Sequence, residues 1–382
     1  MSAIHRAASI EDLRRLARRR VPRVAFDYMD GGAGSENGLT RNRAAFDRLR
    51  LVPRYLVDVT VRDLTTKLFG RRWSMPLGIA PTGLAGLIWP GADLILARAA
   101  VAADVPFILS TAATESLEEV AKVAPDHGWF QLYAGRDQDI VDDLVRRAHA
   151  AGYPVLVVTV DIPVPGKRDR DIRNGLTLPL RPRAATIVDV LSRPRWLLAS
   201  ARAGSPRFRN IEPYVKTARA ISLAEAMAVQ TAGNFDWGRL ARVRDAWPGK
   251  LVVKGLMAPE DVARAAEEGA DGVILSNHGG RQLDAGVAPI EILPRALEAA
   301  AGRIPVMLDS GIRQGGDVVR ALALGAAFCF VARATLYGVA AGGAAGAAKA
   351  LAILRDETDR TLGQLGCRSL GELGPDRLWT GD

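Results

Sequence analysis

The stretch "LVVKGLMAPEDVARAAEEGADGVILSNHGG" (residues 251–280) contains two short apolar runs, Leu251–Val253 and Val273–Leu275, separated by a helix-length amphipathic segment. Both runs are continuously apolar, as is typical of parallel strands covered on both faces. Pro259 suits the first turn of the intervening helix, and Gly269 suits its C-terminal end. The stretch therefore predicts one strand–helix–strand unit of a parallel α/β fold.

The same alternation recurs from residue 75 onward. Eight apolar runs are expected to be strands: Leu77–Ala80, Phe107–Leu109, Trp129–Leu132, Val155–Val160, Leu251–Val253, Val273–Leu275, Val306–Leu308 and Phe328–Val331. Helices are expected between most of them, at Ala92–Ala103, Ser116–Val123, Asp137–Ala151, Pro259–Glu268 and Gly316–Leu324. This pattern predicts a (β/α)₈ TIM barrel. A doubly wound sheet is the alternative, but no G-x-G-x-x-G follows the first strand.

The chain has 382 residues, a length that one barrel with insertions can reach. We expect a single domain over residues 1–382, with a helical segment at 1–75 and an insertion loop at 176–235 after the fourth strand. The Gly- and Ala-rich run at 338–350 is interpreted as a closely packed helix without chemistry.

Composition narrows the class of protein. The two cysteines, Cys329 and Cys367, have neither metal nor disulfide spacing, which indicates a reducing, cytoplasmic compartment. We find no signal-peptide core and no run long enough for a spanning helix. The net charge is +9, and the segment Leu176–Ala220 carries nine basic residues against two acidic ones. One segment therefore supplies most of the imbalance.

Polar or conformationally special residues follow each expected strand. They are Pro81-Thr82, Ser110, Gln131 to Tyr133, Thr159 to Asp161, Lys254, Ser276 to His278, Asp309 and Arg333. A polar strand end is ordinarily a solvated turn. In a barrel, however, all of these ends lie on the C-terminal rim, where active sites of this fold are built.

His278, in "SNHGGRQLD" (276–284), is the leading candidate for a general base, with Asp161 as the carboxylate that orients it. The alternative is a structural histidine in a turn. Arg281 and Arg168 could bind a carboxylate in bidentate fashion, or could be surface arginines. Lys254 could form a Schiff base or stabilise an anionic cofactor ring, and the residues alone do not separate these roles.

Two segments near the end of the barrel suit a phosphate group. "LDSGIRQGGD" (308–317) and "FVARATLYG" (330–338) follow the seventh and eighth strands, where phosphates commonly bind in barrels. Gly311 and Ala332 offer backbone N–H groups, while Arg313 and Arg333 offer charge. The sequence thus implies a phosphate-bearing ligand and gives no indication of a metal site.

Several separated blocks resemble the FMN-dependent α-hydroxy-acid oxidase and dehydrogenase family. In order, they are "FDYMDGGA" (26–33), "MPLGIAPTG" (75–83), "WFQLY" (129–133), "TVDIPVPGKRDRDIRNG" (159–175), "LVVKG" (251–255), "SNHGGRQLD", "LDSGIRQGGD" and "LALGAAFCFVAR" (322–333). The blocks at 81–100, 110–118 and 332–338 are most similar to the branch that oxidises (S)-mandelate, and the L-lactate dehydrogenases come next.

The resemblance implies a role for each matching residue. His278 matches the family's base and Asp161 its carboxylate partner. Arg168 and Arg281, with Tyr28, match the substrate-carboxylate contacts, and Tyr133 matches the contact to the substrate hydroxyl. Lys254 matches the lysine at the N1–O2 edge of the flavin, which favours charge stabilisation over a Schiff base. The FMN contacts implied are Pro81, Thr82, Gly83, Ser110, Gln131, Thr159, Lys254, Ser276, Asp309, Gly311, Arg313, Ala332 and Arg333.

Three departures from the family pattern bear on the ligands. Many relatives carry an aromatic residue near Ser110 where this chain has Ala112, and glycolate oxidases have a second tyrosine where it has Gly135. Both changes enlarge the expected pocket, so the substrate is expected to be (S)-mandelate or a similar aryl or branched hydroxy acid, oxidised to the 2-keto acid. Ala332 replaces a glycine, and phosphate binding is expected to persist if its φ is negative.

The basic insertion also fits this family, whose membrane-associated members contact the membrane through the corresponding loop. "TIVDVLSRPRWLLASARAG" (186–204) has the composition of an interfacial helix on an anionic leaflet, so 176–220 is expected to bind the inner face of the cell membrane peripherally. A lid or an oligomer contact is the alternative, and nucleic acid is excluded because no recognised module accompanies the charge.

A membrane contact favours a quinone as electron acceptor, with an oxygen-using oxidase or an L-lactate dehydrogenase as alternatives. The family also implies a homotetramer. Two other classes of protein stay open: a Schiff-base aldolase acting through Lys254, and a non-catalytic binding protein. Whether the base removes the α-carbon proton or the hydroxyl proton is not visible in the sequence.

Overall fold

A closed barrel of eight parallel strands forms the centre of the molecule, in a computed structural model that describes residues 3–176, 184–214 and 233–381. Neighbouring strands run in the order β10-β3-β4-β5-β6-β7-β8-β9, which confirms the predicted TIM barrel. Each predicted apolar run is one of these strands. Their bounds are β3 Leu77–Ile79, β4 Phe107–Ser110, β5 Gly128–Tyr133, β6 Val155–Thr159, β7 Lys250–Leu256, β8 Gly272–Leu275, β9 Val306–Leu308 and β10 Cys329–Val331.

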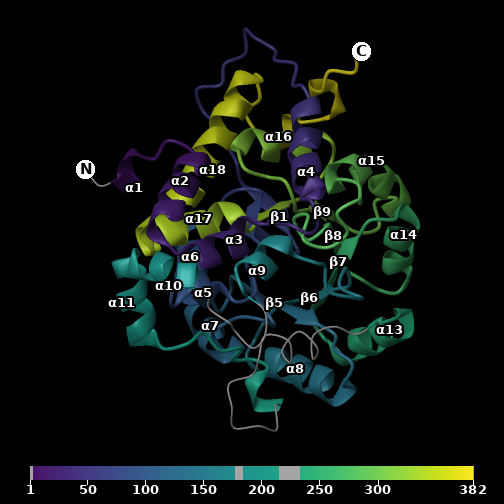
Figure 1. Ribbon diagram of the computed structural model, residues 1–382. Coiled ribbons are helices and arrows are strands. Elements are labelled where there is room, and N and C mark those ends of the chain that lie inside the picture. The colour runs from purple at the N-terminus through teal and green to yellow at the C-terminus, as the bar shows by residue number, and fades with distance from the viewer. Residues whose placement is uncertain (1–2, 177–183, 215–232, 382) are drawn as a thin grey trace.

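Helices surround the strands (Figure 1). The five predicted ones are present as α6 Ala92–Ala103, α7 Leu117–Val123, α8 Gln138–Ala150, α14 Pro259–Glu267 and α16 Gly315–Ala323. Alongside them lie α5 Ala85–Ile88, α13 Trp237–Ala246 and α15 Pro289–Ala300, and short 3₁₀ turns at Leu370–Glu372 and Pro375–Arg377 follow near the C-terminus. Pro259 occupies the first turn of α14, and Gly269 has positive φ just beyond that helix, as the sequence indicated. Gly325 has positive φ just beyond α16 in the same way.

A short antiparallel hairpin closes the N-terminal end of the barrel. It consists of β1 Thr66–Leu68 and β2 Arg71–Trp73, and the side chains of Leu68 and Trp73 join the cluster that fills the barrel interior. The turn residues Phe69 and Gly70 both have positive φ, the geometry of a tight two-residue hairpin. Because this end is plugged, the opposite, C-terminal rim is the end available for a ligand.

The N-terminal segment was expected to be helical over 1–75, and that expectation is wrong beyond Arg48. The helices are α1 Ala3–Arg6, α2 Ile10–Arg20, α3 Arg23–Asp30 and α4 Asn37–Arg48, after which the chain is irregular until the hairpin. Ser9 and Asp12 form a capping box that fixes the start of α2. Helix α2 packs along the C-terminal helices, and α3 brings Tyr28 and Met29 to the rim.

The run at 338–350 is two helices and not one. Helix α17 spans Arg333–Gly342 and α18 spans Ala344–Gln364, with the break at Gly343, whose φ is +60°. A side chain at Gly338 or Gly346 would collide with the backbone of the other residue, because the two helices approach closely there. The small residues serve packing, as expected, but across a sharp corner between two helices.

The insertion between β6 and β7 folds over the outside of the rim. Its described elements are α9 Asp169–Arg173, α10 Ala184–Leu191, α11 Pro194–Ala203 and a 3₁₀ turn at Glu212–Tyr214. The single interfacial helix expected at 186–204 is broken before Pro194, which begins α11 because proline suits a first helical turn. Residues 177–183 and 215–232, which form part of the expected 176–235 insertion and 176–220 membrane contact, lie outside the described residues. No helix within the described ranges combines the length and apolarity needed to cross a membrane.

Candidate active site

One cavity opens at the C-terminal rim, and fourteen of the predicted site residues line it. They are Tyr28, Pro81, Thr82, Gly83, Tyr133, Arg168, Lys254, His278, Arg281, Asp309, Gly311, Arg313, Ala332 and Arg333. The remaining predicted residues, Ser110, Gln131, Thr159, Asp161 and Ser276, lie on the same strand ends, most of them buried. Residues from the ends of all eight strands are thus brought together, as the sequence of polar strand ends predicted.

His278 and Asp161 form a hydrogen-bonded pair in this cavity. The Nδ1 atom of His278 lies 3.0 and 3.2 Å from the two carboxylate oxygens of Asp161. Burial lowers the pKa of His278, and the charge of Asp161 opposes that effect, so the imidazole is neutral at neutral pH. Burial would raise the pKa of Asp161, but the neighbouring His278 and Lys254 lower it overall, which keeps the carboxylate ionised. A neutral imidazole oriented by an ionised carboxylate can accept a proton at Nε2.

The backbone at His278 is unusual. His278, Gly279 and Gly280 all have positive φ, at 58°, 66° and 73°. Such a conformation is uncommon for a residue with a Cβ, and it turns the chain sharply where β8 ends. The hydroxyl of Tyr133 lies 3.4 Å from Nε2 of His278, on the cavity side of the ring. The turn therefore presents Nε2 to the same space as Tyr133.

Two half-buried arginines, Arg168 and Arg281, lie in the same cavity without a carboxylate partner among the described residues. Nη1 of Arg281 donates to the backbone carbonyls of Tyr28 and Gly31, at 2.7 and 2.8 Å. Nε of Arg168 is buried and has no hydrogen-bond partner within the described ranges. Burial and the charge of Arg168 lower the pKa of Arg281 to about 10, so Arg281 remains a cation at neutral pH. Two adjacent guanidinium groups of this kind can bind a carboxylate.

Lys254 is buried near the centre of the rim. Its Nζ donates to Oγ of Ser276 at 2.8 Å and forms an ion pair with Asp309 at 3.0 Å. An ammonium held by a carboxylate lacks the free amine that a Schiff base requires. This geometry supports the charge-stabilising role over the aldolase alternative.

The strand ends of β5 and β6 present unpaired polar atoms. Nε2 of Gln131 and Oγ1 of Thr159 are buried and have no partner in the described part of the chain. Oε1 of Gln131 accepts a hydrogen bond from Ser110, which fixes the orientation of the amide. Because leaving buried polar groups unpaired costs stability, these atoms indicate a polar ligand at this point of the rim.

The loops after β9 and β10 form a second, cationic end of the cavity. Ala332 precedes the first turn of α17 with φ −110°, so its N–H is available at a helix N-terminus, as the sequence required. Arg333 is buried and donates to the carbonyls of Met29, Gly31 and Gly279. Burial and the charges of Arg313 and Arg281 lower the pKa of Arg333 to about 9. A buried cation with only neutral partners at a helix N-terminus suits a phosphate.

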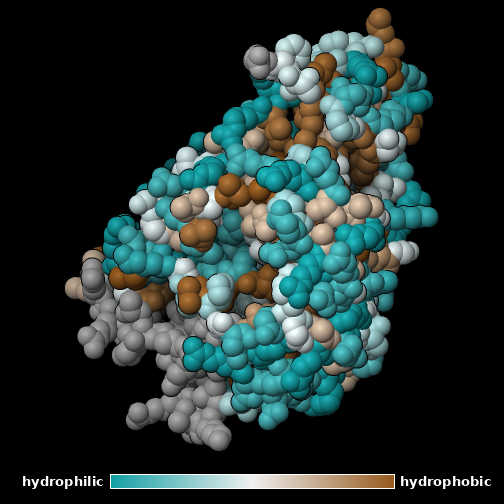
Figure 2. Space-filling model, turned by 90° about the vertical axis from the view of Figure 1, so that its right-hand side faces the viewer, coloured by the Kyte–Doolittle hydropathy of each residue, from teal (hydrophilic) through white to brown (hydrophobic). Residues whose placement is uncertain are grey.

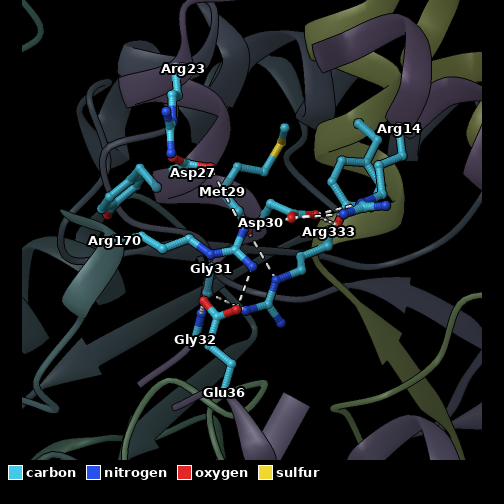
Figure 3. Close-up of polar contacts among 12 residues, drawn as sticks. Arg14, Arg23, Asp27, Met29, Asp30, Gly31, Gly32, Glu36, Arg170 and Arg333 are labelled. Atoms are coloured by element: carbon cyan, nitrogen blue, oxygen red, sulfur yellow. Dashed lines mark hydrogen bonds and ion pairs between the residues drawn. The ribbon is translucent and has the colours of Figure 1, made fainter. Parts of the chain in front are cut away.

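The turn after α3 connects the two cationic ends. Its carbonyls accept hydrogen bonds from both Arg281 and Arg333. The carboxylate of Asp30 points toward Arg14 (Figure 3). Asp30 is buried and accepts hydrogen bonds from Arg14, Arg170 and Tyr337 at 2.6 to 3.0 Å. Arg170 also pairs with Glu36, whose carboxylate accepts the N–H of Gly32. These hydrogen bonds, which lower the pKa of Asp30 despite its burial, fix the position of the turn.

The FMN-dependent dehydrogenase family matches residues 17–380 of the chain. The chain belongs to this family. It is 45% identical to an (S)-mandelate dehydrogenase of Pseudomonas putida over 97% of this chain and 93% of that one. An L-lactate dehydrogenase of Caulobacter vibrioides is 42% identical over 96% of both chains.

Solved structures of the family superimpose on the whole chain. A crystal structure described as the monotopic membrane protein (S)-mandelate dehydrogenase has a TM-score of 0.94 and 44% identity, covering 98% of this chain and 100% of that one. A mandelate oxidase has a TM-score of 0.80 and 37% identity, covering 98% of each. The chain is therefore an FMN-dependent enzyme of the 2-hydroxy-acid dehydrogenase and oxidase family.

The residues of the cavity fit FMN. The unpaired Gln131 and Thr159 atoms suit the polar edge of a flavin ring, and the ammonium of Lys254 suits its N1–O2 edge. The ribityl chain would extend toward Asp309, and the phosphate toward the cationic end formed by Gly311, Arg313, Ala332 and Arg333. In both places, the protein has cationic or hydrogen-bonding groups without a partner in the described structure, and these groups are complementary to the polar and anionic groups of the cofactor.

An apolar wall lines part of the same cavity as the two arginines. Ala112 and Phe208 pack together with Leu84 and Ile211, and Ile162 lines the cavity nearby. Ala112 therefore borders the substrate space, as the sequence suggested. Gly135 is not among the described residues that line the cavity, and its carbonyl accepts a hydrogen bond from Arg239.

The sequence did not reveal two contributions to this site. Phe208 belongs to the insertion, which was interpreted as a membrane contact with a lid or an oligomer contact as the alternative, and a lone aromatic residue there gave no signal. Asp30 and Arg170 lie inside the family blocks at 26–33 and 159–175, but their pairing joins segments 140 residues apart. Each of these blocks contains a charged residue to which no role toward the substrate or the cofactor was given. That feature could have identified Asp30 and Arg170.

Proposed function

We propose that this enzyme oxidises (S)-mandelate, or a similar aryl (S)-2-hydroxy acid, to the 2-keto acid. The observation that carries the proposal is the cavity itself, whose lining combines His278, Arg168 and Arg281 with an apolar wall that contains Ala112 and Phe208. A carboxylate at the arginines would place an aryl group against that wall. The similarity to mandelate dehydrogenases and a mandelate oxidase supports the same substrate class.

Substrate binding begins with the carboxylate. Arg281 is held by the carbonyls of Tyr28 and Gly31, so its remaining N–H groups can pair with the carboxylate without a conformational search. Arg168 brings a second cation, and Tyr28 lies beside Arg281 with its ring 5.0 Å from the guanidinium carbon. Binding the anion removes the repulsion between the two guanidinium groups, so the charge of the substrate contributes to its affinity.

Proton removal is the task of His278. Tyr133 hydrogen-bonds the substrate hydroxyl and so holds the reacting carbon and its hydroxyl near Nε2. Nε2 accepts a proton, and the ionised Asp161 at Nδ1 stabilises the imidazolium that results. FMN, when bound, supplies the acceptor for the two electrons that leave the substrate. The ammonium of Lys254 stabilises negative charge at the polar edge of the cofactor site.

The electron acceptor and the location belong to the same proposal. The apolar side chains of Ile187, Val188, Leu191 and Leu198 on α10 and α11 are 50–66% exposed, next to several arginines. Such a surface suits peripheral binding to the inner, anionic leaflet of the cell membrane, where a quinone can take the electrons. Neighbouring α5 carries Ile88, which lines the cavity, and the indole of Trp196 donates to its carbonyl. The membrane contact would thus lie close to the active site.

A homotetramer is also proposed. A loop that forms the uppermost tip of the molecule exposes Tyr55, Leu56, Val57 and Val61, and Figure 2 shows apolar side chains there. Covering this loop with another subunit would remove an apolar surface from water. Light scattering on the purified enzyme should give four times the chain mass, whereas a monomer would contradict this part of the proposal.

The substrate and acceptor can be tested together. Initial rates with (S)-mandelate, L-lactate and glycolate should be measured with a soluble quinone and, separately, under air with peroxide detection. We expect (S)-mandelate to give the largest kcat/KM and peroxide to account for a small share of turnover. A preference for L-lactate would refute the aryl substrate, and stoichiometric peroxide would identify an oxidase.

A further inference from the structure

Arg20, the last residue of α2, has no acidic partner among the described residues. Its guanidinium carbon lies 3.9 Å from the centre of the Trp89 ring. Its Nε atom is buried and makes no hydrogen bond within the described ranges. Stacking on an indole holds the guanidinium plane in place, but it does not neutralise the charge.

The turn between α10 and α11 packs against this arginine. Nε of Arg193 donates to the carbonyl of Val21 at 3.4 Å, and the Trp196 indole donates to the carbonyls of Leu87 and Ile88 at 3.2 and 3.0 Å. Arg195 lies between these two anchored residues. Its backbone is therefore held near Val21 and Ile88, which adjoin Arg20 and Trp89 in the chain, on a surface that joins the N-terminal segment to the insertion.

The positive charges of Arg20 and Arg195 are near enough to repel each other. Burial and the charge of Arg195 lower the pKa of Arg20. Asp189, the acidic residue of α10, already pairs with Arg193 and accepts the N–H of Arg23. No described carboxylate pairs with either Arg20 or Arg195, so an external anion would relieve their repulsion.

The surroundings indicate which kind of anion. Arg195 and Leu198 are three residues apart on α11 and share one face of that helix, and Leu198 is 56% exposed. Ile187, Val188 and Leu191 on neighbouring α10 are also exposed. An anion that approaches this surface meets a cationic pair bordered by apolar side chains, which matches a lipid with a charged head and acyl chains.

We infer that Arg20 and Arg195, with the ring of Trp89, form a binding site for the phosphate of an anionic membrane lipid. The acyl chains would lie along the exposed apolar faces of α10 and α11. This inference rests on the proposed membrane association and adds to it a defined headgroup site, in place of a diffuse attraction between charges. It also assigns a membrane role to α2, which lies outside the insertion.

The test is vesicle flotation of the FMN-loaded enzyme at fixed ionic strength, with vesicles of phosphatidylglycerol and phosphatidylcholine. Arg20→Gln and Arg195→Gln are compared with Arg18→Gln, which removes an exposed charge from the same helix. One diffuse surface charge contributes about fivefold to binding an anionic membrane. We expect that loss for Arg18→Gln, a loss of twentyfold or more for each site variant, and little further loss in the double variant.

Equal losses for all three variants, or additive losses in the double variant, would refute the headgroup site while leaving membrane association intact. Failure of the unmodified enzyme to float with any vesicle would refute both. If millimolar inorganic phosphate displaced the enzyme from the vesicles, the site would be assigned to a soluble phosphate, and the inference of a lipid ligand would be overturned. Turnover of (S)-mandelate with a soluble acceptor should be unchanged in Arg20→Gln and in the conservative Arg20→Lys, which shows that the variants are folded.

Discussion

At the scale of single residues, the chemistry depends on side chains whose charge state is set by burial. His278 is kept neutral by desolvation and oriented by an ionised carboxylate, whereas Arg281 and Arg333 stay cationic although they are buried. The protein leaves these cations without carboxylate partners in the described structure, so their charge is available to the substrate and the cofactor. Preorganised charge of this kind stabilises bound anions without a reorganisation cost.

The pH dependence of substrate oxidation should report the state of His278. The pKa of His278 is lowered from the ordinary value of 6.5, so the neutral, proton-accepting imidazole predominates at pH 6.5 and above. This form is lost as the pH falls through the lowered pKa. We expect the rate of flavin reduction at saturating substrate to be flat from about pH 7 to 9 and to fall about tenfold per unit well below the His278 pKa. Rapid-mixing absorbance measures this, and a loss of rate centred above pH 7 would contradict the assignment.

Ala112 should control the size of the substrate. Replacing it by phenylalanine would fill the space beside Phe208, so the aryl group would clash while a methyl group would still fit. We expect Ala112→Phe to lower kcat/KM for (S)-mandelate about a hundredfold and to change that for L-lactate much less. Ala113→Ser, at the buried neighbouring position outside the cavity lining, is the control. Equal losses for both substrates in Ala112→Phe would show that Ala112 does not border the aryl group.

At the scale of elements, the turn after α3 is the part of the site that local sequence signals did not reveal. Its carbonyls hold Arg281 and Arg333, and Asp30 holds the turn through residues from α2, α9 and α17. Arg170 also fixes α9, which begins directly after Arg168. One ion-pair network thus positions Arg168, Arg281 and Arg333 at the two ends of the cavity.

Breaking this network should weaken both ligands together. Asp30→Asn removes the charge that Arg14 and Arg170 share, and breaking a buried pair costs about 3 kcal/mol of stability. We expect KM for the substrate and Kd for FMN each to rise about tenfold, while the limiting rate of flavin reduction changes less than threefold. Titration of the apoenzyme with FMN and steady-state kinetics give the two constants.

The matched control is Asp359→Asn. Asp359 lies on α18, away from the cavity, and the substitution breaks its half-buried ion pair with Arg62. It should lower the melting temperature without changing either constant. If Asp30→Asn behaved in the same way, Asp30 would be structural only.

Much of this architecture could be predicted because strands and their ends leave local signals. Apolar runs gave the eight strands, and the first polar residue after a run, such as Lys254 or His278, marked the rim. Features that depend on distant pairing could not be predicted in this way. The Asp30–Arg170 pair, the contribution of Phe208 to the cavity and the corner at Gly343 each require two segments to be placed in space. The hairpin at 66–73 was missed because its turn, Phe69-Gly70, lacks the usual Asn-Gly signature.

At the scale of the whole molecule, the barrel separates stability from chemistry. The hairpin and the packed interior close one end, and the loops, the insertion and α3 build the site at the other. The insertion also carries the exposed apolar faces of α10 and α11 on the outside of the same rim. The molecule can therefore meet a membrane without changing the residues that react.

Membrane binding should be separable from turnover. Replacing both Leu191 and Leu198 by aspartate adds two charges of the wrong sign and removes two exposed apolar side chains. We expect flotation with anionic vesicles to fall at least a hundredfold, because each change opposes interfacial binding. Turnover with a soluble acceptor should stay within twofold. Unchanged flotation would place the membrane contact elsewhere on the molecule.

The proposed oxidation of (S)-mandelate, with His278 as the base, is most directly tested by mixing the FMN-loaded enzyme with (S)-mandelate in the absence of oxygen and following the flavin absorbance. We expect rapid bleaching in the unmodified enzyme. In His278→Asn we expect FMN to be retained and bleaching to be slowed at least a thousandfold, since the amide cannot accept the proton. Rapid bleaching in His278→Asn would contradict the assignment of the base, and a flavin that does not respond to (S)-mandelate in the unmodified enzyme would contradict the proposed reaction.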